Sequence, residues 1–367
     1  MIPDSAPELA GQAILAGFPG THPPAELISA SRRGQLAGWV LFARNLGTPE
    51  EIAALCGQLR GAAGAAVPPW IAVDQEGGRV QRLKAPAVPV VQLPPVRAIG
   101  AADDAALTEE AAWRLGVGLR ALGFNLDFAP VVDVDTNPAN PVIGDRSFSA
   151  DAAHVARHGL AFAHGLARAG IAACAKHFPG HGDTVLDSHL ALPRLAHARE
   201  RLDRVELAPF RALAPHVPAV MTAHVVFDAL DSGVPATLSR RVVTGLLREE
   251  IGFGGVVFTD DLEMRAIADG WGVGEAACLA IEAGCDAVLV CSKPELWLEA
   301  HAAVTRRAES NAGFARRLRE ACARSFAARR RFAVAPVAPA DVRAALARIA
   351  PAAFEARLAA AIARPRA

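Results

Sequence analysis

Eight short apolar runs, separated by longer segments, constrain the fold of this 367-residue chain more than any other feature. The runs are rich in Val, Ile, Leu, Phe and Ala, a composition typical of strands buried on both faces of a parallel sheet. They span residues 13–18, 38–42, 69–75, 124–134, 171–178, 219–227, 255–262 and 286–291. Eight strand–helix units predict a single α/β domain of the (β/α)8 barrel type, with an open doubly wound sheet as the alternative.

Capping residues indicate where several of the intervening helices begin. Thr48, followed by Pro49 and by Glu51 three positions on, forms a capping-box pattern, and another helix is expected to begin near Thr108.

In the helix before the fifth run, His154 and His158 stand four residues apart. This spacing predicts that both histidines lie on a partly exposed helix face.

The region after the eighth run has a different composition. Two helices are expected around residues 295–308 and 312–332, followed by a segment rich in Pro, Ala and Arg. We therefore predict a barrel catalytic domain over residues 1–332. Residues 333–367 are predicted to be a linker and a C-terminal helix or tail, with no second catalytic domain.

Composition excludes several classes of function. Lys plus Arg and Asp plus Glu both total 38, and the isoelectric point is about 7.2, so no nucleic-acid partner is expected. We find no uncharged apolar run long enough to span a membrane. The six cysteines lack CxxC spacing, and the N-terminus lacks the basic region of a secretory signal. We expect a cytoplasmic monomer that acts on a small molecule.

Polar side chains gather where the predicted strands end. In a (β/α)8 barrel the carboxyl ends of the strands form the face that carries the active site. These residues are Asp74, Gln75, Asp133, Asp135, Lys176, His177, His224, Asp260 and Asp261. The function is therefore expected to depend on this face.

The segment 176–189, which leaves the fifth strand, holds six ionisable residues. Three interpretations of this segment do not involve acid–base catalysis. The segment could be a solvated loop; His177, His181 and His189 could bind a metal, although their spacing is not a familiar ligand pattern; or Lys176 could form a Schiff base.

A fourth interpretation joins this segment to FTDDLEM (258–264). Asp260 ends the seventh strand and could act as a nucleophile, while Asp187 could orient the imidazole of His189 as a proton donor. Hydrolysis of a glycoside with retention requires these two parts, a carboxylate that attacks the anomeric carbon and an acid that protonates the leaving oxygen. Histidine titrates near neutrality, which suits that role.

KHFPGHGDTVLDSHLALP (176–193) closely resembles the signature of glycoside hydrolase family 3, in particular its β-N-acetylglucosaminidase branch, which carries an Asp–His dyad on a loop. The resemblance continues in order along the predicted barrel. Its other motifs are GWVLFARN (38–45), VDQEGGRVQRL (73–83), FNLDFAPVVDV (124–134), VIGDRSF (142–148), VMTAHVVF (220–227), PATLSRRVVTGLLREEIGFGGVVFTDDLEM (235–264) and AGCDAVLVC (283–291).

The resemblance implies a role for each matching residue. Asp260 corresponds to the nucleophile, His189 to the acid/base and Asp187 to its partner. Asp261 is the weaker nucleophile candidate, because neighbouring side chains on a strand point to opposite faces. The residues implied to bind the sugar ring are Asp74, Arg82, Arg146, Lys176 and His177.

The resemblance also implies an activity. Members of this branch release terminal β-linked N-acetylglucosamine with retention, and lone-barrel members resemble the peptidoglycan-recycling enzymes that act on anhydro-muropeptides. No cofactor and no metal are implied. A phosphorylase on the same scaffold and a non-catalytic sugar-binding protein are the alternatives. We hypothesise that the loop 178–189 swings His189 into and out of the site.

Overall fold

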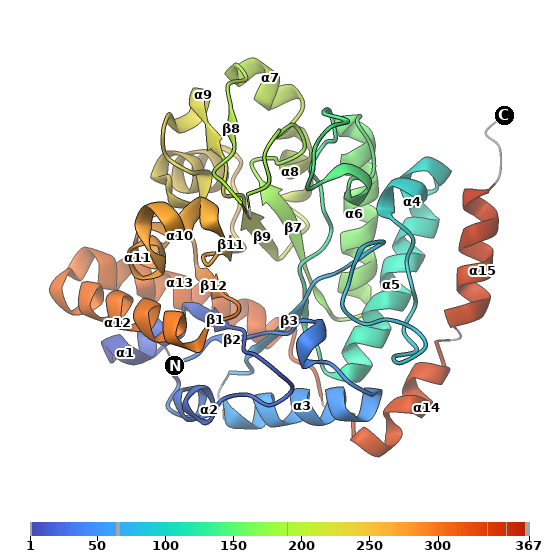
Figure 1. The fold of residues 1–367 in the computed structure, drawn as a ribbon, viewed down its shortest axis with the longest axis horizontal. Helices are drawn as coiled ribbons and strands as arrows, with labels where there is room; N and C mark the ends of the chain where they lie inside the picture. Colours follow the sequence, from blue (N-terminus) through green and yellow to red (C-terminus); the bar gives the residue numbers. More distant parts are fainter. Residues whose placement is uncertain (1, 64–66, 189, 336, 350, 364–367) are drawn as a thin grey trace.

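The computed structural model describes residues 2–63, 67–188, 190–335, 337–349 and 351–363. Eight parallel strands close into a barrel in the order β1-β12-β11-β9-β7-β6-β3-β2 (Figure 1). Their bounds are Ile14–Ala16 (β1), Gly38–Val40 (β2), Trp70–Val73 (β3), Leu126–Asp127 (β6), Ala172–Phe178 (β7), Ala219–Thr222 (β9), Val256–Asp261 (β11) and Ala287–Val290 (β12). Each predicted run contributes one barrel strand, so the (β/α)8 barrel is confirmed.

Side chains fill the inside of the barrel. Trp70 and Phe128 both contact Phe258 edge to face, with ring centroids 6.0 and 5.6 Å apart. Phe332, at the end of the last barrel helix, packs against the same interior cluster. The interior is a packed core and not a pore, so the active site is expected at the mouth of the barrel.

Helices cover the outside of the barrel (Figure 1). Their bounds are Ala6–Gly11 (α1), Ala25–Arg32 (α2), Pro49–Ala62 (α3), Val96–Ala102 (α4), Ala105–Leu122 (α5), Ala152–Arg168 (α6), Arg199–Arg204 (α7), Ala208–Leu213 (α8), Asp228–Asp231 (α9), the π-helical Arg241–Glu250 (η4), Arg265–Trp271 (α10), Val273–Ala283 (α11), Pro294–Ser310 (α12), Ala312–Arg331 (α13), Val342–Ala347 (α14) and Pro351–Ile362 (α15).

The capping predictions differ in outcome. The Thr48 capping box is confirmed at the start of α3. The start near Thr108 is wrong, because Asp104 caps α5 by accepting the N–H of Leu107 at 2.9 Å. An aspartate carboxylate is a strong N-cap, and here it begins the helix before Thr108 is reached. Thr108 is buried inside the first turn.

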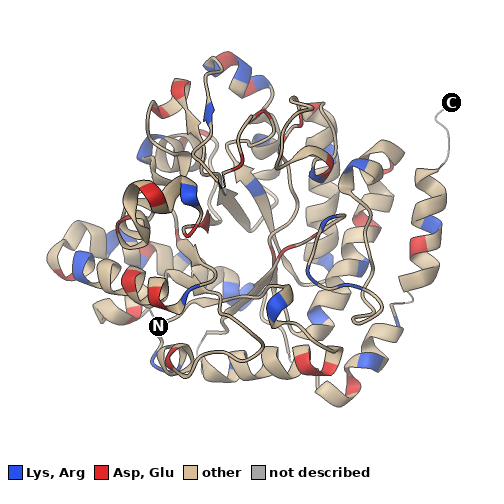
Figure 2. Cartoon of the chain, in the orientation of Figure 1, with Lys and Arg blue, Asp and Glu red and all other residues tan. Residues whose placement is uncertain are grey.

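The amino-terminal end of the barrel is closed by α13. Its Arg329 is buried and donates to the carbonyl oxygen of Ala37, just before β2, at 2.8 Å. Beyond it, α14 and α15 pack against α3, α4 and α5, with Phe354 and Leu358 buried (Figure 1). Figure 2 shows acidic and basic residues interspersed along the outer helices. Among the described helices none is long and apolar enough to cross a membrane.

Two pairs of short strands lie beyond the barrel strands. Strands β4 (Gln75–Gly77) and β5 (Val80–Gln81) form an antiparallel hairpin directly after β3. Strands β8 (Arg194–Leu195) and β10 (Val226–Phe227) pair after β7 and β9. The β4–β5 hairpin turns at Gly77 and Gly78, whose φ angles of 114° and 55° suit glycine. This turn directs the hairpin back over the mouth of the barrel.

Candidate active site

One cavity of about 250 Å³ opens at the carboxyl ends of the barrel strands. Its lining includes eight of the residues singled out from the sequence: Asp74, Arg82, Arg146, Lys176, His177, His181, Asp260 and Asp261. Ser188 also lines the cavity, whereas Asp187 is not among its lining residues. His189, the predicted acid/base, lies outside the described residues. Chain segments far apart in sequence therefore meet in a single site.

A group of four side chains, Asp74, Glu76, Arg146 and Lys176, forms the charged network of the site. Lys176 Nζ lies 2.8 Å from Asp74 Oδ1 and 2.6 Å from Glu76 Oε1. Arg146 binds Glu76 through two parallel hydrogen bonds of 2.8 Å each. Arg82 approaches Asp74 at 3.3 Å. Paired, directional charges of this kind can recognise the hydroxyl groups of a sugar.

The charged network keeps Glu76 and Lys176 ionised. Burial would raise the pKa of Glu76, but Arg146 and Lys176 outweigh it and hold that pKa far below its usual value. Burial would lower the pKa of Lys176, but Asp74 and Glu76 raise it above its usual value. Lys176 is thus held as a cation, which does not favour the Schiff-base interpretation, since that chemistry needs a neutral amine.

His177 is oriented by a buried carboxylate. Its Nδ1 donates to Asp133 Oδ2 at 2.7 Å, and Asp133 also accepts the backbone N–H groups of His177 and His181. Burial opposes ionisation of Asp133, yet the charge and hydrogen bond of His177 lower its pKa. A carboxylate behind an imidazole fixes both its tautomer and its direction.

The two adjacent aspartates at the end of β11 differ electrostatically. Burial would raise the pKa of Asp260, but His177, His224, the backbone N–H of Asp261 and Lys176 bring it below the usual value. Burial raises the pKa of Asp261 to about 7, and the charges of Glu263 and Asp260 add to the increase. Asp260 is therefore the ionised carboxylate near neutral pH.

The β7 loop comprises the described residues 179–188 and 190–193. Its base is fastened through His181, which is buried. The Thr184 hydroxyl donates to the His181 carbonyl, so it accepts a hydrogen bond from His181 Nδ1. Because Nδ1 carries the hydrogen, Nε2 of the same ring accepts the Ser188 hydroxyl at 3.0 Å. Both ring nitrogens of His181 are thus engaged, which does not favour the metal interpretation of this loop.

The outer part of the β7 loop, unlike its buried base, carries exposed apolar side chains. Val185, Leu186 and Leu190 are exposed, with Val185 showing 72% of its surface to solvent. They flank Asp187 in sequence. Exposed apolar side chains around a binding site are typical of surfaces that contact a ligand.

Sequence reasoning missed several members of the site. Glu76 falls within the VDQEGGR motif but was not singled out, and Asp133 was noticed only as a polar residue at a strand end. His181 was considered only as a metal ligand and Ser188 was given no role, although the two are hydrogen-bonded partners in the loop. For Glu76, His181 and Ser188 the available signal was proximity, since each stands within a few residues of a predicted site residue; for Asp133 it was the position at the end of a predicted strand.

Comparisons with known proteins agree with this geometry. Residues 18–320 match the model of the glycosyl hydrolase family 3 N terminal domain. A beta-hexosaminidase of Pseudomonas aeruginosa is 40% identical over 285 residues, covering 76% of this chain and 82% of that protein. A beta-hexosaminidase of Alkalilimnicola ehrlichii is 40% identical over 289 residues, covering 77% and 81%.

Solved structures are similar as well. A family 3 beta-N-acetylglucosaminidase from Paenibacillus sp. superposes with a TM-score of 0.87 at 44% identity, covering 95% of this chain and 68% of that one. NagZ from Neisseria gonorrhoeae, in complex with N-trifluoroacetyl-D-glucosamine, superposes with a TM-score of 0.78 at 31% identity, covering 96% and 98%.

A closed barrel with buried carboxylates and a charged network at its mouth suits glycoside hydrolysis, and the family match with its relatives shows that the protein is a glycoside hydrolase. The chain belongs to glycosyl hydrolase family 3, with beta-hexosaminidases among its relatives. The family resemblance drawn from the sequence motifs is therefore confirmed.

Proposed function

We propose that the protein removes terminal β-linked N-acetylglucosamine from peptidoglycan fragments by a retaining mechanism. In the first step, Asp260 attacks the anomeric carbon while His189 delivers its proton to the departing glycosidic oxygen. A covalent glycosyl-enzyme forms, and the rest of the substrate leaves as an alcohol. In the second step, His189 takes a proton from water, the water oxygen attacks the anomeric carbon, and Asp260 is released.

One observation carries the assignment of the nucleophile. The neighbouring aspartates are driven in opposite directions, with the pKa of Asp260 lowered and that of Asp261 raised to about 7. A nucleophile must be ionised at the working pH, and pairs of carboxyl groups with separated pKa values commonly mark different roles. This supports Asp260 over Asp261.

The remaining residues are assigned to binding and to proton transfer. Asp74, Arg82, Arg146, Lys176 and His177 are proposed to hold the sugar ring, which their positions in one cavity support. Asp187 is proposed to orient His189 and to raise the basicity of its imidazole. No step requires a cofactor or a metal ion.

Anhydro-muropeptides are proposed as the natural substrate class, and a cytoplasmic monomer as the working form. NagZ from Neisseria gonorrhoeae, which matches the chain over nearly its whole length, was solved with an N-acylated glucosamine. The six cysteines are all free and buried, which suits a reducing compartment. We keep the division into a catalytic unit over residues 1–332 and an accessory segment over residues 333–367.

The test uses nitrophenyl N-acetyl-β-glucosaminide, with and without inorganic phosphate, and identifies the sugar that is released. Free β-N-acetylglucosamine in both conditions is the expected result. A sugar 1-phosphate formed faster with phosphate would replace the hydrolase by the phosphorylase alternative. No release at all would favour the non-catalytic sugar-binding alternative. The same assay on an anhydro-muropeptide then tests the natural substrate class.

A further inference from the structure

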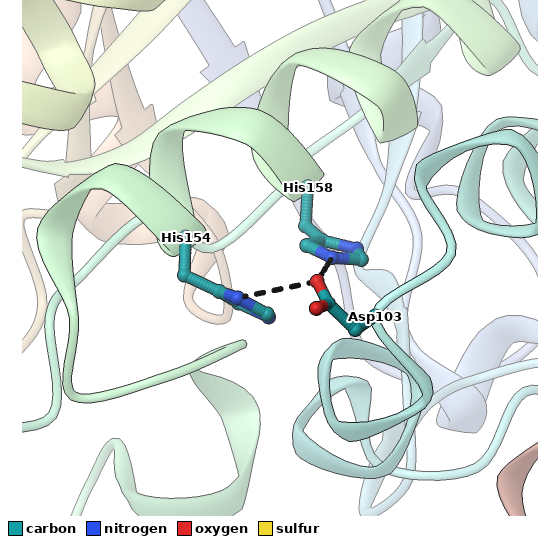
Figure 3. Close-up of side chains that lie close together, drawn as sticks. All are labelled: Asp103, His154 and His158. Carbon is teal, nitrogen blue, oxygen red and sulfur yellow. Dashed lines mark ion pairs between the residues drawn. The ribbon is translucent and has the colours of Figure 1, made fainter. Parts of the chain in front are cut away.

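A second group of titratable side chains lies away from the active site, between α4 and α6. Asp103 follows the last residue of α4, while His154 and His158 stand one turn apart on α6 (Figure 3). The prediction of a partly exposed helix face is wrong for His158, which is completely buried. The packing of α4 and α5 against α6 covers this part of the helix.

One nitrogen of each histidine ring faces the same carboxylate oxygen. Asp103 Oδ1 lies 3.6 Å from His154 Nδ1 and 3.7 Å from His158 Nε2 (Figure 3). The three atoms all lie within 4.8 Å of one another. Ligands of a tetrahedral Zn²⁺ ion, each about 2.0–2.1 Å from the metal, are separated by about 3.4 Å. Small side-chain rotations would bring the three atoms to that spacing.

The opposite nitrogen of each ring determines the tautomer. His154 Nε2 lies 2.9 Å from the carbonyl oxygen of Gly100, which can only accept, so Nε2 carries the hydrogen and Nδ1 presents its lone pair to Asp103. His158 Nδ1 lies 2.8 Å from the Thr108 hydroxyl, which itself donates to the Asp104 carbonyl. The hydroxyl then accepts from Nδ1, and His158 Nε2 also presents a lone pair.

This arrangement is the one in which histidines bind metals. A metal-binding histidine commonly donates its other ring N–H to a carbonyl or a polar side chain, which fixes the ring. His158 Nε2 is moreover a buried nitrogen without a hydrogen-bond partner among the described residues. Burial, together with the neighbouring charges of His154 and Arg157, lowers the pKa of His158 to about 4, so this ring is neutral near pH 7.

A cation already approaches this position from the protein itself. The guanidinium of Arg157 contacts Asp103 Oδ1 and lies 3.1 Å from His154 Nδ1. Its side chain is half exposed, so it can turn into solvent without leaving a buried charge behind. Arg157 therefore competes for two of the three ligand atoms and sets the affinity for any ion that replaces it.

We propose that Asp103, His154 and His158 form a binding site for a divalent transition-metal ion such as Zn²⁺, which displaces the Arg157 guanidinium and joins α4 to α6. Two imidazoles and one carboxylate suit Zn²⁺ better than Mg²⁺ or Ca²⁺, which prefer oxygen ligands. Water would complete the coordination. The site shares no residue with the cavity at the barrel mouth.

The test measures zinc binding to chelator-treated protein by equilibrium dialysis and elemental analysis. Because carboxylates at the barrel mouth could bind zinc as well, the decisive quantity is the difference between the unmodified protein and its variants. We expect His154→Gln and His158→Gln each to bind one ion fewer per chain. His164→Gln, a matched change at an exposed histidine on the same helix, is expected to bind as the unmodified protein does.

Thermal unfolding gives an independent readout. At a zinc concentration 100 times the dissociation constant of this site, the unmodified protein is expected to gain about 4 °C more in Tm than His154→Gln gains. If His158→Gln fails to fold because its site is buried, His154→Gln and Asp103→Asn carry the comparison. An equal zinc-dependent shift in the unmodified protein and in His154→Gln, or no shift in the unmodified protein, would overturn the proposal.

Arg157→Gln separates this proposal from a purely structural role. If Arg157 competes with the metal, its removal is expected to tighten zinc binding about tenfold. If the group is only an ion-pair contact between α4 and α6, the same variant lowers Tm and leaves zinc binding unchanged. That second result would contradict the proposal.

Discussion

The charged network and the β7 loop form two sides of one cavity, but they are built differently. In the network, Glu76 and Lys176 are each 3% exposed and are paired with opposite charges at 2.6 to 2.8 Å. In the β7 loop His181 and Ser188 are buried and hydrogen-bonded to each other, whereas Val185, Leu186 and Leu190 are exposed. The charged network is therefore preorganised, whereas the β7 loop presents apolar side chains to solvent.

The difference matters because the two sides are proposed to do different work. Binding a ring of fixed shape benefits from rigid, already desolvated partners, since little order has to be created on binding. Proton transfer to a leaving group must tolerate entry of the substrate and departure of the products. A loop held at its base and exposed at its tip is suited to both events.

The largest effect is expected from Asp260→Asn, which removes the proposed nucleophile while preserving its shape. Turnover of nitrophenyl N-acetyl-β-glucosaminide should fall by roughly 10⁴-fold or more, the scale observed when a covalent nucleophile is lost. Tm should change little. The matched variant Asp261→Asn should retain far more activity, and the reverse order would transfer the role to Asp261.

A smaller effect is expected from Glu76→Gln, which breaks the charged network. Lys176 and Arg146 would lose a shared negative partner in a buried setting, and such losses cost about 3 kcal/mol. We expect Tm to fall and KM to rise by about ten- to a hundredfold, with kcat less affected, as steady-state kinetics and thermal unfolding would measure. An unchanged KM would contradict a role in holding the sugar.

Ser188→Ala tests the loop side and should have a milder effect. It removes the hydrogen bond from the Ser188 hydroxyl to His181 Nε2, worth about 1 kcal/mol. We expect kcat to fall about fivefold on substrates with poor leaving groups and less on nitrophenyl glycosides, with KM and Tm nearly unchanged. Equal losses on both substrates would argue that the loop does not position the acid.

The smallest effect concerns stability and pH. The pKa of Asp261 is raised from about 3.8 to about 7, so between these values the folded state binds more protons than the unfolded state. Stability should therefore fall as pH rises from about 4 to 7. Asp261→Asn should remove on the order of 1 kcal/mol of this loss, making the variant more stable than the parent at pH 8 but not at pH 4.

The fold was accessible from sequence because its signal is local and repeated. Each barrel strand is a continuous apolar run, and a parallel sheet covered on both faces requires that composition. The strand-end residues Asp74, Lys176 and Asp260 were found for the same reason, since the direction of a barrel strand sets which of its ends carries the site.

The start of α5 shows where local signals compete. Thr108 and Asp104 both have capping side chains, and the structure selects Asp104, while Thr108 turns to His158 fifty residues away. The prediction that His158 is partly exposed was wrong for the same reason, because a local pattern does not report tertiary contacts. A spacing of four residues places two histidines on one helix face, but it does not say what packs against that face.

The number of strands, the position of the mouth and the strand-end residues Asp74, Lys176 and Asp260 follow from patterns within the chain, because periodicity and strand direction are properties of neighbouring residues. Three features do not follow from such patterns. They are the pairing of Glu76 with Arg146 and Lys176, the opposite pKa shifts of Asp260 and Asp261, and the proximity of Asp103 to His154 and His158. They depend on burial and on distances across the folded molecule, since charges interact according to their separation in space and their access to water.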